Sequence, residues 1–201
     1  MRDIIKPSVI LFIICLIVTA ALAFTFNITK DTIAARASLD AENARKEVLV
    51  DAESFRQLED AQIESIVKNN PKTQIVKEVF EGIKAEKIIG YVFSVTNKGY
   101  GGEIDVIVGI DTTGKVIGVK VGDHSETPGL GTKATDQSFL SQLAGITPKE
   151  ALKVVKVKGS DKDEDITAVS GATTSSKAIV GATQAALDFY RELVKEGGVS
   201  Q

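Results

Sequence analysis

The hydroxyl-rich run at residues 165–181 holds the residue types best suited to chemistry in this sequence. In order it contains Ser170, Gly171, Ala172, Thr173, Thr174, Ser175 and Ser176, directly before a segment with helical periodicity. A helix N-terminus presents free N–H groups and a positive dipole end, which suit a phosphate. A Gly beside a small residue lets a bulky group approach the backbone, and a hydroxyl could hydrogen-bond the phosphate or become its ester oxygen. Ser and Thr are also ordinary helix caps, so these residues alone leave both interpretations open.

A second candidate segment is the loop at residues 122–135, which is rich in Gly, Thr and charged residues. Its centre reads Glu126, Thr127, Pro128, Gly129, Leu130 and Gly131. Proline fixes φ and glycine reaches backbone conformations closed to other residues, so such a loop can present peptide N–H groups to a planar ring without crowding it. A rigid surface turn is the alternative interpretation.

The scarce residue types exclude several redox centres. With one Cys, one His and no Trp, the chain alone cannot supply a four-Cys iron–sulfur cluster, a zinc site of the usual Cys/His type or a bis-His haem. No disulfide can form within the chain, so an electron carrier of this sequence needs an organic cofactor. The net charge of -3, with dispersed Lys and Arg, argues against nucleic-acid binding. The acidic run at residues 161–165 lacks metal-ligand spacing and reads as a solvated loop.

An uncharged apolar segment at residues 7–28 lies between Lys6 and Lys30. Its length of about 22 residues is enough to cross a hydrocarbon core as a helix. A cleaved signal peptide is the alternative, because residues 21–23 resemble a cleavage site, but the apolar run exceeds the usual signal core. We therefore expect a retained single-pass anchor in contact with lipid. Positive charges flank both ends and leave the orientation open, while a signal anchor before one long domain favours export of that domain.

The remaining elements indicate an α+β fold, an antiparallel sheet flanked by helices. Residues 31–62 have no Gly or Pro, which predicts a helical stalk ending as a first helix against the domain; no sustained heptad supports a coiled coil. β-rich runs predict strands at 74–80, 88–96, 104–110, 116–121 and 151–157, with a hairpin turning at 111–114. Helices are expected at 137–144 and 174–195. The predicted organisation is an anchor (1–30), a stalk with the first helix (31–70) and a folded domain (71–201).

Three motifs together resemble the FMN-binding domain family. The sequence Ser170-Gly171-Ala172-Thr173 before a helix resembles the family's flavin attachment motif. Residues 97–104 with 108–111 resemble its glycine-rich turn into the central hairpin, and residues 124–131 resemble its Glu-Thr-Pro-Gly-Leu-Gly loop. The motifs follow the family's order behind an N-terminal span, so the resemblance covers nearly the whole chain. Family members often have Asp where this chain has Thr167.

The resemblance implies covalent FMN, esterified through its phosphate to Thr173 by a dedicated flavin transferase. It also implies cofactor contacts from Ser170, Gly171, Ala172, Thr174, Glu126, Thr127, Gly129, Leu130 and Gly131. His124 could donate a proton to reduced flavin, because histidine titrates near neutral pH; a structural or exposed His is the alternative. Tyr100 could stack on the ring or shield it, or it could simply anchor a turn.

The family includes the G subunit of Rnf-type electron-transport complexes and the C subunit of sodium-pumping NADH:quinone reductase. The compact length favours the G subunit, a single-pass relay in the cell membrane that works with other subunits of an ion-translocating ferredoxin:NAD oxidoreductase. The resemblance implies that this chain alone has no complete active site. The chain lacks a dinucleotide-binding Gly fingerprint, so we do not expect it to bind NAD. Three alternatives stay open: the C subunit, a membrane-anchored flavin sensor, and a hydrolase using Ser170 and His124.

Overall fold

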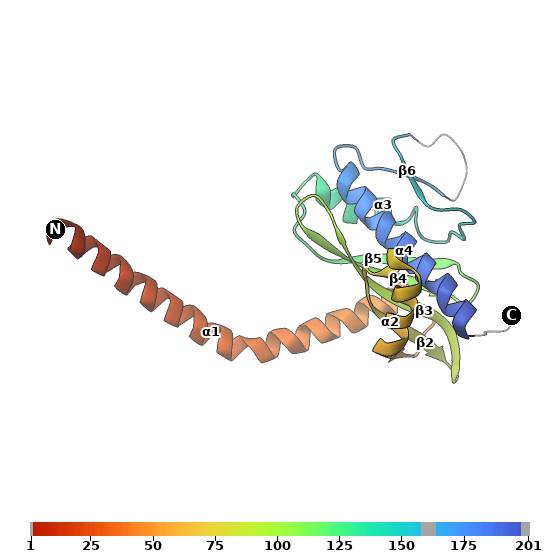
Figure 1. The fold of residues 1–201 in the computed structure, drawn as a ribbon, viewed down its shortest axis with the longest axis horizontal. Helices are drawn as coiled ribbons and strands as arrows, with labels where there is room; N and C mark the ends of the chain where they lie inside the picture. The colour runs from red at the N-terminus through yellow and green to blue at the C-terminus, as the bar shows by residue number, and fades with distance from the viewer. Residues whose placement is uncertain (1, 158–163, 198–201) are drawn as a thin grey trace. The chain divides into compact units, whose positions relative to one another are not determined.

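The computed structural model describes residues 2–157 and 164–197 of the chain. The chain falls into two compact units, Met1–Asn43 and Ala44–Gln201. The first is helical, and the second holds the sheets and the shorter helices (Figure 1). Most of the acidic run at 161–165 lies outside the described residues.

Helix α1 (Arg2–Val48) supplies the first unit and continues into the second. From Ile5 onward it is long and apolar enough to cross a membrane, with a mean hydropathy of 2.9 over a window in which no residue is buried. The hydroxyl of Thr25 donates to the carbonyl of Ala21 at 3.0 Å, and that of Thr29 to the carbonyl of Thr25 at 3.0 Å. These bonds provide the two threonine hydroxyls with hydrogen-bond acceptors, which the hydrocarbon of a bilayer does not offer. The predicted span at residues 7–28 is one uninterrupted part of α1.

The helix predicted over residues 31–62 is wrong beyond Val48. The chain turns there, and strand β1 (Ser54–Gln57) pairs antiparallel with β2 (Val76–Lys84). Val48, Leu49 and Ala52 are buried in a cluster with Val92 of the sheet. Burying these side chains stabilises the fold by more than continuing the helix would, because helix propensities differ by only tenths of a kcal/mol per residue.

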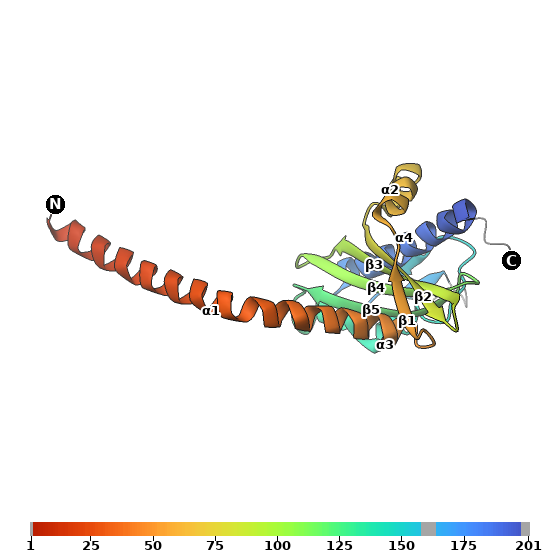
Figure 2. The same ribbon diagram turned by 90° about the horizontal axis from the view of Figure 1, so that it is seen from below.

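Helix α2 (Asp60–Asn69) packs against the domain and buries Ile63 and Ile66. A short 3-10 turn, η1 (Pro71–Thr73), follows it. Helix α2 lies beside the last helix, α4 (Thr173–Gly197), where the side-chain amide of Asn69 donates to Glu196 Oε1 at 2.8 Å (Figure 2). The compact unit thus already begins within the stretch expected to be stalk.

Five antiparallel strands form the main sheet in the order β1-β2-β3-β4-β5. After β1 and β2 come β3 (Lys87–Lys98), β4 (Glu103–Asp111) and β5 (Val116–His124). Each strand pairs with the next one along the chain, so the sheet is a simple meander. The strands predicted at 74–80, 88–96, 104–110 and 116–121 are confirmed, as is the hairpin.

The hairpin turn between β4 and β5 is fixed by one carboxylate. Oδ1 of Asp111 accepts hydrogen bonds from the backbone N–H groups of Thr113 at 2.8 Å and Lys115 at 3.0 Å. Gly114 has φ of 83°, a conformation that favours glycine. The hydroxyl of Tyr190 on α4 donates to the carbonyl of Thr112 at 2.8 Å, which ties the turn to the helix.

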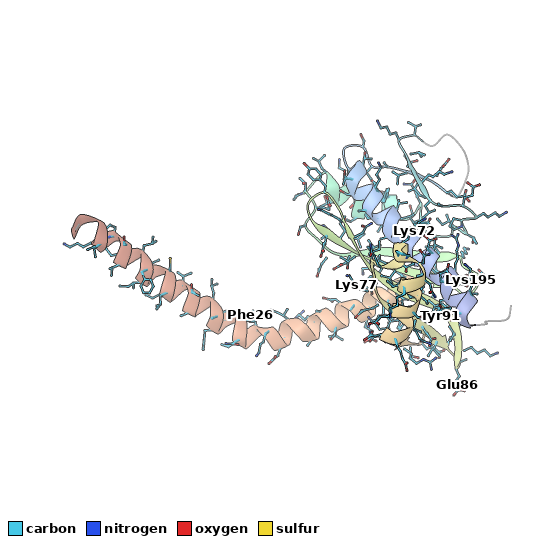
Figure 3. The ribbon with its side chains drawn as sticks, in the orientation of Figure 1. Phe26, Lys72, Lys77, Glu86, Tyr91 and Lys195 are labelled. Carbon is cyan, nitrogen blue, oxygen red and sulfur yellow. The ribbon has the colours of Figure 1, made fainter. Side chains whose placement is uncertain are left out.

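Helix α4 covers one face of the sheet and forms the main core with it. The rings of Phe189 and Phe93 pack edge to face with centroids 5.7 Å apart. Tyr190 and Tyr91 have ring centroids 6.0 Å apart; Figure 3 labels Tyr91 on its strand near the C-terminal end of α4. The predicted final helix and its apolar stripe are confirmed, because Ile179, Ala182, Ala186 and Phe189 are all fully buried.

A two-stranded parallel sheet, β6 (Lys153–Val155) and β7 (Asp165–Thr167), completes the unit. Only β6 falls in a predicted strand; β7 was not predicted. Helix α3 (Gln137–Leu140) is shorter than the helix expected over 137–144, and the 3-10 helix η2 (Gly131–Thr135) precedes it. The α+β class is confirmed.

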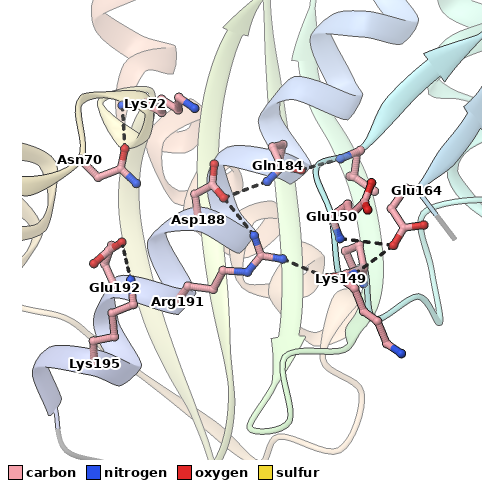
Figure 4. Close-up of polar contacts among 12 residues, drawn as sticks. Asn70, Lys72, Lys149, Glu150, Glu164, Gln184, Asp188, Arg191, Glu192 and Lys195 are labelled. Carbon is pink, nitrogen blue, oxygen red and sulfur yellow. Dashed lines mark hydrogen bonds and ion pairs between the residues drawn. The ribbon is translucent and has the colours of Figure 1, made fainter.

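Polar side chains on α4 fasten the segment that leads into β6 (Figure 4). Oε1 of Gln184 accepts from the N–H of Leu152 at 2.8 Å, and its Nε2 donates to Asp188 at 2.8 Å. Arg191 donates to Asp188 and, through Nη2, to the carbonyl of Pro148 at 2.9 Å. This network serves structure, and it lies on the helix C-terminal to the hydroxyl-rich run.

Replacing Gly109 with Ala should loosen the segment around Val48 from the sheet. A Cβ at Gly109 would collide with the backbone carbonyl of Val48, and such overpacking costs about 1–3 kcal/mol. Chemical denaturation of the detergent-solubilised protein measures the loss. Gly122→Ala is the matched control on the neighbouring strand, because its Cβ would meet Asp105 at an ordinary 3.6 Å. Equal stability of the two variants would contradict this account of the packing.

Candidate functional site

Three segments far apart in the sequence enclose one cavity. They are the glycine turn (residues 99–102) between β3 and β4, the signature loop (residues 126–131) after β5, and the start of α4. The cavity has a volume of about 370 Å³ and is lined by Tyr100, Glu126, Thr127, Leu130, Gly131, Gly171, Ala172, Thr173, Thr174 and Ser175. It lies entirely within the second unit.

The start of α4 presents backbone donors and hydroxyls to this cavity. Gly171 turns the chain into the helix with φ of 79°, and a Cβ there would come within 3.3 Å of Leu130 Cδ2. The N–H of Ser176 bonds the carbonyl of Ala172 at 2.9 Å. The N–H groups of the residues between them stand in the first turn, where a helix offers no acceptor of its own. They leave a site for an anion.

The four consecutive hydroxyls of α4 fall into two pairs. Thr173 and Thr174 are exposed and line the cavity, whereas Ser175 and Ser176 are buried. Ser176 donates to the carbonyl of Ala172 at 2.9 Å and accepts from the N–H of Val169 at 3.1 Å. Ser175 donates to Glu126 Oε2 at 2.7 Å. The exposed hydroxyls are the ones available to a ligand.

Glu126 is the buried charged group at the junction of the three segments, with 5% of its surface exposed. Its Oε1 accepts hydrogen bonds from the N–H groups of Tyr100 at 2.8 Å and Gly101 at 3.2 Å. Its Oε2 accepts the hydroxyl proton of Ser175. One carboxylate therefore joins the glycine turn and the first turn of α4 to the signature loop.

Glycines are required where the chain passes this carboxylate. A Cβ at Gly99 would collide with Glu126 Oε1, and one at Gly131 would collide with Glu126 Oε2. A Cβ at Gly101 would collide with the carbonyl of Ser125. The glycine pattern that identifies these two segments in the sequence thus follows from the space that Glu126 and its loop occupy.

The environment of Glu126 favours its charged form. Burial is the largest single influence and opposes ionisation, but the hydrogen bonds from Ser175, Gly101 and Tyr100, with the charge of His124, together lower the pKa of Glu126 below its ordinary 4.5. The carboxylate is therefore ionised at neutral pH, because its charge is shared among three hydrogen bonds.

The structure brings most of the residues expected to contact the cofactor together around the cavity, with two exceptions. Ser170 is exposed and Gly129, with φ of 76°, has open space beside it; neither lines the cavity. Tyr100 lines it. Ser175 is an additional lining residue, and its pairing with Glu126, 49 residues away, left no signal in the sequence. Whether these residues contact FMN stays a prediction.

His124 does not line the cavity. It ends β5, and its Nδ1 accepts the N–H of Glu126 at 3.4 Å. No hydrogen bond joins it to Ser170 in the described part of the chain, so the pair needed for the hydrolase alternative is not assembled. Among the described residues there is also no cluster of His, Cys, Asp and Glu that could hold a metal ion.

Two family models match the chain. Residues 99–188 match the FMN-binding domain, and residues 1–48 match the RnfG N-terminal region. The first match begins at the glycine turn and includes the signature loop and most of α4, so it contains every lining residue of the cavity. The second covers the apolar helix.

Relatives support the same grouping, and solved structures support the fold. The chain is 32% identical, over 94% of its length and 93% of the relative's, to the G subunit of the Na(+)-translocating ferredoxin:NAD(+) oxidoreductase complex of Acetobacterium woodii. It is 35% identical to the G subunit of the proton-translocating complex of Clostridium ljungdahlii, over 89% and 86%. Shewanella oneidensis NqrC has a TM-score of 0.50 at 26% identity, covering 59% of this chain and 61% of that one. A second NqrC, from Parabacteroides distasonis, has a TM-score of 0.51 at 19% identity over 75% and 79%, which supports the fold.

Replacing Glu126 with Gln should destabilise the second unit at pH 7 by about 1–3 kcal/mol, because hydrogen bonds to a charged group are lost. The lowered folded-state pKa means that the carboxylate stabilises the fold above pH 4.5 and that this contribution is lost as the pH falls through the folded pKa. The difference in free energy of unfolding between wild type and Glu126→Gln should therefore become smaller below pH 4.5. Denaturation at pH 7 and at pH 4 measures it.

The control for this prediction is Glu103→Gln, which removes an exposed carboxylate next to the glycine turn. It should unfold within about 0.5 kcal/mol of wild type at pH 7. A deficit in Glu126→Gln that is the same at both pH values would show that the shape of the side chain, not its charge, is what matters.

Proposed function

Because the chain belongs to the family of G subunits of ion-translocating Rnf oxidoreductase complexes, we propose that it is the FMN-carrying subunit of such a complex. The relatives described above are subunits of ferredoxin:NAD(+) oxidoreductases, and this chain contains the FMN-binding domain. Its role is to relay electrons beside the other subunits. The observation that carries the proposal is the cavity at the start of α4, where the exposed Thr173 stands at a helix N-terminus.

The cavity fits a flavin mononucleotide in size and chemistry. Its volume of about 370 Å³ lies within the range of small-ligand sites. The first-turn N–H groups of α4 suit the phosphate. Leu130 and Tyr100 are 50% and 76% exposed and offer apolar surface to a planar ring.

The attachment point is Thr173, with the FMN phosphate esterified to its Oγ1. The hydroxyls of Ser175 and Ser176 are buried and engaged, which leaves Thr173 and Thr174 exposed on the cavity. The match to the family's attachment motif selects Thr173. A flavin transferase supplies the FMN, so it is a partner of this chain during maturation.

FMN, when bound, supplies the exchange of one or two electrons. The chain does the rest: the first turn of α4 binds the phosphate, while the glycine turn and the signature loop form the walls. Helix α1 anchors the domain in the cell membrane next to the integral subunits. Electron transfer between the domain and those subunits is then effectively intramolecular. The domain lies on the extracytoplasmic side.

A C subunit of Na(+)-translocating NADH:quinone reductase is the second candidate, and the similarity to Shewanella oneidensis NqrC favours it. That similarity covers 59% of this chain, whereas the similarity to the Acetobacterium woodii protein covers 94%. The proposal of an Rnf-type complex therefore has the broader support.

Thr173→Ala should abolish covalent FMN, because it removes the ester oxygen. The wild-type chain is co-expressed with a flavin transferase, denatured and examined by in-gel fluorescence and intact mass; it should fluoresce and carry the mass of one FMN minus one water. Thr174→Ala, a matched change at the neighbouring exposed hydroxyl, should keep the adduct. An adduct that survives in Thr173→Ala and disappears in Thr174→Ala would move the attachment by one residue.

Sidedness is tested with a single cysteine outside the span. Cys15 is the only cysteine, so Cys15→Ser with Ser138→Cys leaves one thiol at an exposed position of α3. A membrane-impermeant maleimide should label it in intact cells, and Cys15→Ser alone should stay unlabelled. Labelling that requires lysis of the cells would place the domain in the cytoplasm.

A further inference from the structure

We propose that Glu126 is a tuning residue whose fixed negative charge in the cavity wall lowers the reduction potential of the bound FMN. The inference rests on the proposed function, since it concerns the cofactor that this cavity is proposed to hold. It assigns to Glu126 a role beyond the packing of the three segments.

The charge of Glu126 is held in place. The side chain is 5% exposed and is fixed by three donors, Tyr100 N–H, Gly101 N–H and the Ser175 hydroxyl. A Cβ at Gly99 or Gly131 would collide with the carboxylate, so the chain packs closely against it on these two sides. A fixed charge acts on whatever occupies the cavity without first having to reorient.

The lining of the cavity offers no Lys or Arg to neutralise the charge. No ion pair joins Glu126 to a cation in the described part of the chain. The three donors are neutral groups that stabilise the charge without cancelling it. The titratable side chain that acts on Glu126 is His124, at the end of β5, whereas Tyr100 contributes its backbone N–H.

Reduction makes a flavin more negative when electrons outnumber the protons taken up. Near neutral pH the reduction takes two electrons from the donor and one proton from solvent, a net gain of one negative charge. A carboxylate in the wall repels this charge, and the repulsion is larger in a protein interior than in water. The reduced form rises in free energy relative to the oxidised form, so the potential falls; charge near the flavin is a recognised means of such tuning.

The test compares wild type, Glu126→Gln and Glu103→Gln as full-length, flavinylated proteins in detergent. Gln keeps the size of the side chain and can still accept from the glycine turn, whereas Glu103→Gln removes one exposed negative charge that does not line the cavity. Intact mass first establishes one FMN on each protein. Spectroelectrochemical titration at pH 8 then gives the midpoint potentials.

We expect Glu126→Gln to shift the ratio of reduced to oxidised flavin at a fixed potential by about tenfold, equivalent to about +30 mV for a two-electron couple. Glu103→Gln should change the ratio less than twofold. A potential in Glu126→Gln that equals wild type, or lies below it, would overturn the tuning role while leaving the proposed function intact. Absence of FMN from the wild-type protein would instead remove the proposed function itself.

A measurement on wild type alone covers the case in which Glu126→Gln takes up no FMN. The potentials of the protein and of free FMN are compared at pH 8, where Glu126 is ionised and reduction adds one net negative charge. The protein's potential should lie below that of free FMN. A potential equal to that of free FMN, or above it, would overturn the proposal.

Discussion

The burial of one carboxylate is the constraint on which the site depends. A buried charge is costly unless hydrogen bonds satisfy it, and Glu126 has its donors on two segments that are remote from it in sequence. Those segments must meet at Glu126 for the charge to be tolerated. The glycine turn, the signature loop and the first turn of α4 therefore hold one another in position, and the cavity lies where they meet.

Helix α4 connects this site to the core. Its apolar stripe, which includes Ile179 and Phe189, packs on the sheet and fixes the position of the helix. Its first turn projects from that packed body into the cavity. Burial of Ser175 and Ser176 belongs to the same packing, and it leaves Thr173 and Thr174 as the exposed hydroxyls. The packing of the core therefore determines which hydroxyls of residues 173–176 a ligand can reach.

Local sequence patterns were enough to predict the meander and the last helix, because β-branched alternation and a helical stripe are properties of short segments. They failed at Val48, where the helix ends because Val48, Leu49 and Ala52 bury themselves with Val92, a residue far along the chain. They also missed β7, whose three residues are ordered by parallel pairing with β6. The motifs predicted most of the cavity wall, but the bond from Ser175 to Glu126 spans 49 residues and is visible only in three dimensions.

The close packing of glycines against Glu126 has a consequence for the speed of electron transfer. Each time a carrier gains or loses an electron, the surrounding dipoles must adapt, and this reorganisation energy forms part of the barrier. Around Glu126 the glycines at 99 and 131 admit not even a methyl group, and the donors already point at a fixed charge. A wall of this kind contributes little to the reorganisation energy of a cofactor beside it, which lowers the barrier to electron transfer.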